Sequence, residues 1–195
     1  MDTIKLEEKK LEFKRLVMEN ISRNGVAQII QYLENETDFF KAPASSKYHG
    51  AYAGGLLEHS INVFKMLNES EILKKENISK ESIAIVSLFH DICKVNMYVE
   101  GTRNVKKDGV WVQVPTYNIQ EKMPYGHGEK SVYILMREGL KLTDEEALAI
   151  RYHMGGFTDS VKGGSYALNS VFNSNILALE LHLADMRATY YLENQ

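Results

Sequence analysis

Apolar residues recur at helical spacing along most of the chain and alternate with polar residues only in one central stretch. The helical spacing predicts amphipathic helices over residues 3–35, 51–71, 79–95, 128–138, 143–153 and 168–192. The first is expected to break at Asn24-Gly25, a turn-forming pair. Ser79 is a typical helix N-cap, and Thr143 with Glu146 has the spacing of a capping box. The pattern predicts an all-α fold, with loops over residues 37–50 and 155–165.

The central exception is residues 97–119, where valines and aromatic residues favour β-structure. Asp108-Gly109 divides this stretch into two halves and is a strong signal for a tight hairpin turn. We therefore expect a small β-hairpin inserted into the helical fold. A lid and a dimer contact are the two interpretations of its role.

The size and composition are those of one soluble globular domain. The chain has 195 residues, of which 44% are hydrophobic and 25% are charged. We predict a single domain over residues 1–195, with N-terminal helices over 1–46 and the main core over 47–192. The net charge is −3, and the basic residues are interspersed with acidic ones. No basic stripe indicates a nucleic-acid partner, although nucleic acid stays open as a substrate.

The cysteine content and the N-terminus bear on location. The chain has one cysteine, Cys93, so no disulfide can form within it. The first residues are charged and lack the apolar core of a signal peptide, and no apolar run approaches the ~18 residues of a membrane span. We expect a cytoplasmic protein with no membrane partner, and the oligomeric state is left open.

The strongest chemical signal is the pair His90-Asp91, which ends an apolar run. Burying two such polar side chains is costly unless they are paired or bound to a metal. All six histidines lie between positions 49 and 182, and several predicted helices could each offer one ligand to a shared point. Imidazole with carboxylate suits Fe, Mn, Zn or Ni better than Ca, which prefers oxygen ligands. The candidate metal ligands are His59, His90, Asp91, His127, His153 and Asp185.

The order of these residues resembles the HD superfamily of metal-dependent phosphohydrolases, whose pattern is His, then His-Asp, then Asp, with two extra histidines in binuclear members. The run His-Asp-Ile-Cys-Lys at 90–94 is similar to the His-Asp-x-x-Lys signature. Residues 51–60, Ala-Tyr-Ala-Gly-Gly-Leu-Leu-Glu-His-Ser, are similar to the first-ligand helix of the branch that contains bacterial 3′-to-5′ exoribonucleases. The resemblance covers about residues 47–190 and includes no counterpart of their nucleic-acid-binding barrel, so their substrate is not carried over.

The resemblance implies an HD-domain helical bundle that binds two divalent transition-metal ions (Fe, Mn, Zn or Ni, with Mg as a further candidate), with Asp91 as the bridge. It implies a phosphohydrolase, a phosphomonoesterase or phosphodiesterase, that uses a metal-activated hydroxide on a nucleotide or a related small phosphorylated metabolite. Asp91 and Lys94 are the expected catalytic residues, and Lys94 is also expected to hold a phosphate oxygen. His49, Arg151 and Glu129 are weaker candidates for substrate contact or proton transfer.

Two other functions fit the same residues. Some HD-fold proteins with four histidines and two aspartates hold di-iron and are oxygenases, and another alternative is a nucleotide-binding module without turnover. His127 and His153 lie at predicted helix ends, where a histidine can simply cap carbonyls. His182 shares a helix face with Asp185 and is expected to support a ligand or the core, and Cys93 is expected to be a small core residue.

Overall fold

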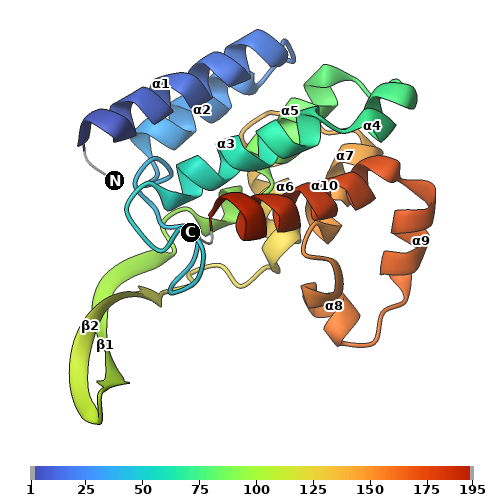
Figure 1. Cartoon of the computed structure of the whole chain (residues 1–195). Helices are drawn as coiled ribbons and strands as arrows, with labels where there is room; N and C mark the ends of the chain where they lie inside the picture. Colours follow the sequence, from blue (N-terminus) through green and yellow to red (C-terminus); the bar gives the residue numbers. More distant parts are fainter. Residues whose placement is uncertain (1–2, 194–195) are drawn as a thin grey trace.

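The computed structural model describes residues 3–193, and residues 1–2 and 194–195 lie outside it. Helices dominate the described chain, with a single two-stranded sheet among the described residues (Figure 1). The predicted helical bundle with a small β-hairpin is confirmed. The elements are α1 (Thr3–Asn20), α2 (Val26–Asn35), α3 (Gly55–Asn68), α4 (Glu71–Lys75), α5 (Lys80–Phe89), the 3₁₀ turn η1 (Ile92–Lys94), β1 (Tyr98–Lys107), β2 (Val110–Ile119), α6 (His127–Arg137), α7 (Asp144–Tyr152), the 3₁₀ turn η2 (Gly155–Phe157), α8 (Asp159–Lys162), α9 (Ala167–Ser174), α10 (Ile176–Arg187) and the π-helical turn η3 (Ala188–Leu192).

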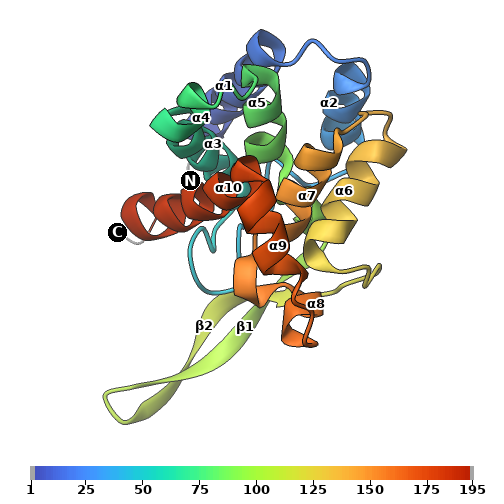
Figure 2. The ribbon, with the colours of Figure 1, turned by 90° about the vertical axis from the view of Figure 1, so that its right-hand side faces the viewer.

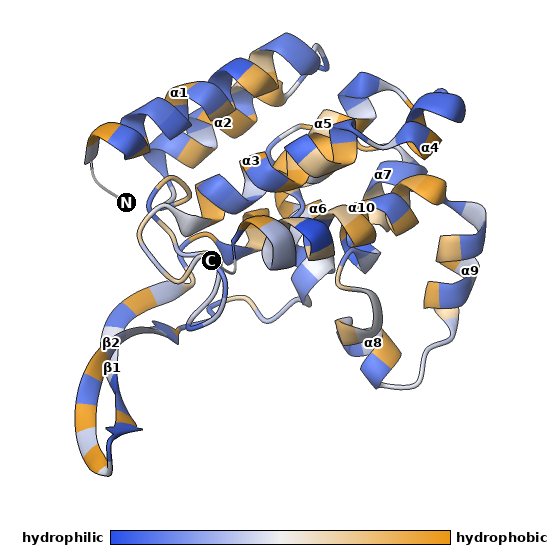
Figure 3. Ribbon diagram, in the orientation of Figure 1, coloured by the Kyte–Doolittle hydropathy of each residue, from blue (hydrophilic) through white to orange (hydrophobic). Residues whose placement is uncertain are grey.

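The body of the molecule is built around α3, which packs against α5 on one side and α10 on another. Helix α1 lies over α3 and α5, while α6 and α10 both pack on α7 (Figures 1 and 2). Colouring by hydropathy shows hydrophilic and hydrophobic positions interspersed along the helices, as in amphipathic helices (Figure 3). In the part of the chain that the structure describes, no helix combines the length and the apolar character that a membrane crossing requires.

An aromatic cluster joins the N-terminal helix to the rest of the core. The ring of Phe13 lies 5.1 Å from that of Phe39 and 5.9 Å from those of Phe40 and Phe89. Phe13, Phe39 and Phe89 are fully buried. Because each buried aromatic side chain contributes roughly 1.5–3 kcal/mol, this cluster is a main reason why α1 stays on α5.

The break predicted at Asn24-Gly25 is confirmed, and a partly buried ion pair lies beside it. Gly25 has φ +98°, and a Cβ there would lie 2.2 Å from the carbonyl oxygen of Gly139. Arg23, just before it, donates to both carboxylate oxygens of the fully buried Glu146 at 2.6 and 3.0 Å. Glu146 also closes the predicted capping box with Thr143, which is confirmed. The start of α7 is therefore fixed to the turn between α1 and α2.

Three predicted helices have different bounds in the structure. The helix predicted over 168–192 is wrong as one piece, because Asn175 is extended, caps α10 by accepting from the N–H of Ala178, and donates to the carbonyl of Glu145. The helix predicted over 51–71 starts at Gly55 and ends at Asn68, and Ser70 caps a separate α4. The helix predicted over 79–95 ends at Phe89, with His90 as its C-cap, and the backbone leaves helical geometry at Asp91. The predicted 155–165 loop contains the short η2 and α8.

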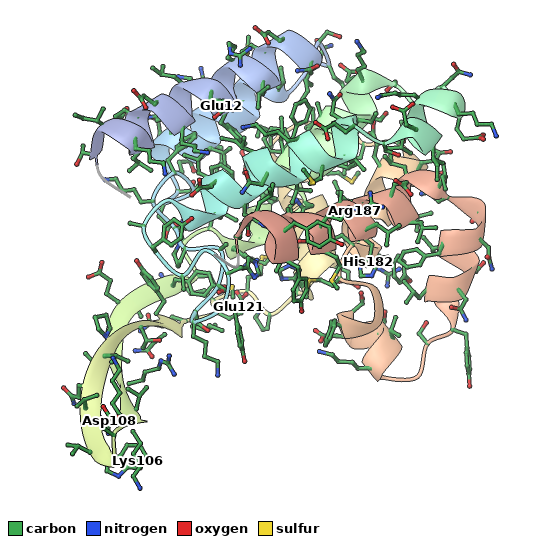
Figure 4. The ribbon with its side chains drawn as sticks, in the orientation of Figure 1. Glu12, Lys106, Asp108, Glu121, His182 and Arg187 are labelled. Carbon is green, nitrogen blue, oxygen red and sulfur yellow. The ribbon has the colours of Figure 1, made fainter. Side chains whose placement is uncertain are left out.

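The hairpin predicted over 97–119 is confirmed. β1 and β2 pair antiparallel from Tyr98 with Ile119 to Lys107 with Val110. Asp108 and Gly109 both have positive φ, as the tight turn requires. The hairpin projects from the helical body, and Lys106 and Asp108 lie at its free end (Figures 1 and 4). Near its base, the N–H of Tyr117 and the hydroxyl of Thr116 donate to the carbonyl of Ser46.

Candidate metal centre

The six candidate ligands come from five separate segments that meet inside the helical body. His59 lies in the middle of α3 and Asp185 in α10, two helices that pack directly on each other. The other four stand at helix ends. His90 and Asp91 follow α5, His127 is the first residue of α6, and His153 directly follows α7.

Asp91 is at the centre of the cluster. Its Oδ1 lies 2.7 Å from Nε2 of His127 and 3.5 Å from Nε2 of His153. Its Oδ2 lies 3.5 Å from Nε2 of both His59 and His90. The structure therefore surrounds one carboxylate with the same nitrogen of four different imidazoles.

A second carboxylate, that of Asp185, approaches the same nitrogen of His59. Nε2 of His59 lies 3.2 Å from Oδ1 of Asp185 and 3.2 Å from Nε2 of His90. Two of the triads whose ligand atoms lie within 4.8 Å of one another are His59, His90 and Asp185, and His90, Asp91 and His153. Since these two triads share His90, the donors form one continuous array.

The backbone at the helix ends sets the orientation of the two most buried histidines. Nδ1 of His90 donates to the carbonyl of Ser87 at 2.8 Å, and Nδ1 of His153 donates to the carbonyl of Ile150 at 2.6 Å. Carbonyls in the last turn of a helix have no partner within the helix, so they are available to accept. Each bond fixes the proton on Nδ1 and leaves the Nε2 lone pair directed at the cluster. Capping and metal binding are therefore compatible roles for His153.

The charges of the cluster are strongly coupled. Burial lowers the pKa of His90 to about 3, so this ring is neutral. Burial also opposes a charge on His59, but Asp185 and Glu193 outweigh it and raise the pKa of His59 to about 10. Against burial, Lys94 and the neighbouring imidazoles hold the pKa of Asp91 well below its ordinary value. The carboxylates are thus ionised, as cation ligands must be.

The donors fit a transition-metal site. The buried Nε2 of His153 makes no hydrogen bond in the described structure, although it is directed at Asp91. Buried polar atoms without a partner are uncommon and call for a physical explanation. Imidazole nitrogens with carboxylate oxygens, mutually within ligand distance, are the donor set of Zn, Fe, Mn or Ni. The cluster is therefore one that could hold metal ions, while the role of each residue stays a prediction.

The remaining predicted site residues fall into two groups. Lys94 belongs to the cluster, with its Nζ 2.6 Å from Oδ2 of Asp91, and the ring of His49 lies 5.1 Å from that of His59. Arg151 and Glu129 instead form an ion pair with each other at 3.0 Å. They line a groove of about 630 Å³ between α6 and α7, whose described lining includes none of the six candidate ligands. Substrate contact by these four residues stays a prediction.

Sequence reasoning did not identify Glu193, which lies against His59. Its two carboxylate oxygens each lie 3.1 Å from Nδ1 of His59.

Two other residues, Cys93 and His182, contact the histidines of the cluster. Cys93 is buried, as predicted, but its Sγ lies 3.4 Å from Nδ1 of His127. Nδ1 of His182, labelled on α10 in Figure 4, donates to the carbonyl of His153, which is the predicted supporting position.

The fold and the cluster together define a helical protein with a buried imidazole and carboxylate site. No family model matches the chain, and no solved structure matches it. Among curated proteins, the chain is 32% identical over 83 residues to the dihydroneopterin 2′,3′-cyclic phosphate phosphodiesterase of Methanocaldococcus jannaschii. The match covers 40% of this chain and 31% of that relative. The chain therefore has partial homology to a phosphodiesterase.

Proposed function

We propose that this protein is an HD-type, metal-dependent phosphohydrolase that cleaves a phosphodiester in a small phosphorylated metabolite. The single observation that carries the proposal is the convergence of four Nε2 atoms on the carboxylate of Asp91. The partial likeness to a cyclic phosphate phosphodiesterase supports the same class of reaction. The order of the cluster residues along the chain, which resembles the HD pattern, supports it independently.

The donors of this chain would be divided between two metal ions. His59, His90 and Asp185 form one triad, His127 and His153 lie on the other side, and Asp91 contacts both groups. When bound, divalent ions lower the pKa of water to about 7 and neutralise charge on phosphoryl oxygens. The carboxylates of Asp91, Asp185 and Glu193 outnumber the ammonium of Lys94, so the cluster becomes negatively charged once the protons of His59 and His127 are displaced. That charge favours the binding of divalent cations.

Lys94 is the residue that would hold the substrate phosphate. It is a buried ammonium beside Asp91, and the negative charge of Asp91 outweighs the effect of burial and raises the pKa of Lys94. It therefore stays charged at neutral pH and acts as a point charge for a phosphoryl oxygen. His49 lies against His59 with a buried Nε2 that makes no hydrogen bond among the described residues. This nitrogen is available for a polar group of the substrate.

The name of the relative narrows the class of phosphate esters to be tested as substrates. The enzyme of Methanocaldococcus jannaschii is named for a 2′,3′-cyclic phosphate. We therefore place small cyclic phosphodiesters, of nucleosides or of pterin-like metabolites, before phosphomonoesters.

Phosphate-ester hydrolysis by metal-loaded full-length protein tests the proposal. The protein is stripped with a chelator, reloaded separately with Mn²⁺, Fe²⁺, Zn²⁺ or Ni²⁺, and given 2′,3′-cyclic, 3′,5′-cyclic and monophosphate nucleotides. We expect turnover of a diester with at least one metal and none after chelation. Oxygen uptake by the iron-loaded protein without any phosphate-ester cleavage would overturn the proposal in favour of an oxygenase. Affinity for nucleotide without turnover of any substrate would favour a binding module.

Replacing Lys94 separates substrate binding from metal binding. We expect Lys94→Met to lower kcat/KM by about 10–100-fold, because a charge-assisted contact contributes roughly 1.5–3 kcal/mol. Metal content is expected to stay near that of the native protein. Lys130→Met is the matched control, since Lys130 is also buried and paired with a carboxylate, Glu121, outside the cluster. An equal loss of kcat/KM in both variants would remove Lys94 from the substrate site.

A further inference from the structure

The C-terminal segment of the described chain holds His59 from both sides. Asp185 on α10 lies 3.2 Å from Nε2 of His59, and Glu193 lies 3.1 Å from Nδ1 of the same ring. Glu193 also accepts a hydrogen bond from Nδ2 of Asn62 at 3.0 Å, one turn further along α3. Its side chain is 3% exposed, although it is the last residue that the structure describes. The Glu193 carboxylate is therefore held in one place by its contacts with His59 and Asn62.

The backbone between Asp185 and Glu193 is not α-helical throughout. Asp185 and Glu193 are eight positions apart, which in a continuous α-helix is about 12 Å along the axis. The segment Ala188–Leu192 is instead π-helical, and it lies against α3. Such turns occur frequently at functional sites. Both α10 and this segment pack on α3, and together they place the two carboxylates against the same ring.

We propose that Glu193 is a positioning residue, which fixes the ring orientation of His59 and keeps the proton on Nδ1 so that Nε2 is presented to the metal. The inference deepens the proposed function, on whose metal site it rests. Metal-binding histidines generally donate their second N–H to a carboxylate, a backbone carbonyl or water. His90 and His153 have backbone carbonyls for this purpose, since they stand at helix ends. His59 is in the middle of α3, where the carbonyls are used by the helix, so it needs an acceptor from elsewhere.

The geometry favours this role over that of an additional ligand. Both oxygens of Glu193 are at hydrogen-bond distance from Nδ1, and one also accepts from Asn62. If Glu193 bound a metal ion instead, its carboxylate would lose the hydrogen bond that it accepts from Nδ1 of His59. His49, Glu193 and His59 do lie close enough to hold an ion of their own, so the number of bound ions is part of the test.

The experiment measures metal binding directly, without substrate. Metal-free full-length protein is titrated with Zn²⁺ alone by calorimetry, and thermal unfolding is recorded in parallel. We expect Glu193→Ala to weaken the binding of one ion by about 10–100-fold. Glu193→Gln is expected to stay within about threefold of the native affinity, because its amide oxygen accepts the same N–H. Tyr191→Ala is the control, since Tyr191 is exposed in the same π-helical turn.

A spectroscopic readout distinguishes positioning from general stabilisation. In the Zn²⁺-loaded protein, proton–nitrogen correlation spectra should show the proton of His59 on Nδ1 in the native chain and in Glu193→Gln. Native affinity in Glu193→Ala would overturn the inference while leaving the proposed function intact. An equal loss in Tyr191→Ala would also overturn it, as would three bound ions in the native chain and two in Glu193→Ala. Failure of the native chain to bind Zn²⁺ at all would overturn both proposals.

Discussion

Two neighbouring residues, Phe89 and His90, belong to two different interiors of the same molecule. Phe89 is the last residue of α5 and packs on Phe13 in the aromatic cluster. His90 follows it and faces His59 and His153, with ring centroids 5.2 and 4.8 Å away. Both side chains are fully buried. The chain therefore passes from an apolar interior to an ionisable one within a single peptide unit.

The two interiors have opposite effects on folding. The aromatic cluster stabilises the protein simply because its surface is removed from water. The imidazole and carboxylate cluster costs free energy when buried, and only its mutual hydrogen bonds and charges offset that cost. We therefore expect changes in the apolar interior to affect stability, and changes in the polar interior to affect metal binding.

Removal of Asp91 should have the largest effect of all. Asp91→Ala deletes the carboxylate that four imidazoles and Lys94 share. We expect metal retention and turnover to be abolished, a loss beyond the ~100-fold that removing an outer-shell partner produces. Metal content by mass spectrometry and diester hydrolysis are the measurements. Turnover at the native level in Asp91→Ala would refute the site.

Truncation of Phe13 should have the next largest effect, and this effect should be on the free energy of unfolding instead of on metal binding. Phe13→Ala opens a cavity among Phe39, Phe40 and Phe89. We expect the free energy of unfolding to fall by about 3–5 kcal/mol, with the metal content of the folded fraction unchanged. Urea unfolding checks this against Leu11→Ala, an exposed position on the same helix that should shift stability by less than about 0.5 kcal/mol. Loss of metal from folded Phe13→Ala would show that the two interiors are not independent.

The pH dependence should differ in sign between metal binding and metal-free stability. Burial opposes the charge on His127, but Cys93 and Asp91 outweigh it and raise its pKa to about 10, as carboxylates do for His59. Both values lie above the ~6.5 of free imidazole, so at pH 7 each ring carries a proton that a metal must displace. Affinity should therefore rise between pH 7 and 9, by up to about tenfold per unit for each displaced proton.

Metal-free stability should show the opposite trend over the same range. A raised pKa in the folded state stabilises the protein below about 6.5, and that contribution is lost as the pH rises toward 10. Thermal unfolding in chelator should therefore occur at lower temperature at pH 9 than at pH 7. Calorimetry in buffers of different ionisation enthalpy measures the released protons. A metal affinity that is flat between pH 7 and 9 would contradict the charge states assigned to His59 and His127.

Features decided by local sequence were predictable. The turn at Gly25, the capping box at Thr143 and the Asp108-Gly109 hairpin each depend on residues within a few positions of one another. The split at Asn175 was not predictable, because it depends on a hydrogen bond to the carbonyl of Glu145 in another helix. Apolar periodicity continues across that position, so it indicates one helix where the tertiary structure makes two.

The site divides in the same way. The order of His59, His90-Asp91 and Asp185 could indicate a metal site, because the residue types limit the chemistry. Glu193 could not be identified, because its approach to His59 depends on a π-helical turn that the local sequence does not mark. The mutual pairing of Arg151 and Glu129 was equally hidden, since their spacing of 22 positions becomes a contact only when α6 packs on α7.

The hairpin offers the smallest expected effect and a contrast to both interiors. Trp111 is 68% exposed, pairs across the strands with Lys106 and lies outside the aromatic cluster and the polar cluster. We expect Trp111→Ala to change the free energy of unfolding by less than about 0.5 kcal/mol and to leave metal affinity unchanged, because surface substitutions that remove no specific contact have small effects. Urea unfolding and Zn²⁺ titration measure both quantities. A loss of more than about 2 kcal/mol would mean that the hairpin is covered in solution. A loss that shrinks on dilution of the protein would identify a second copy of the chain as its cover, because the native chain then loses the same association.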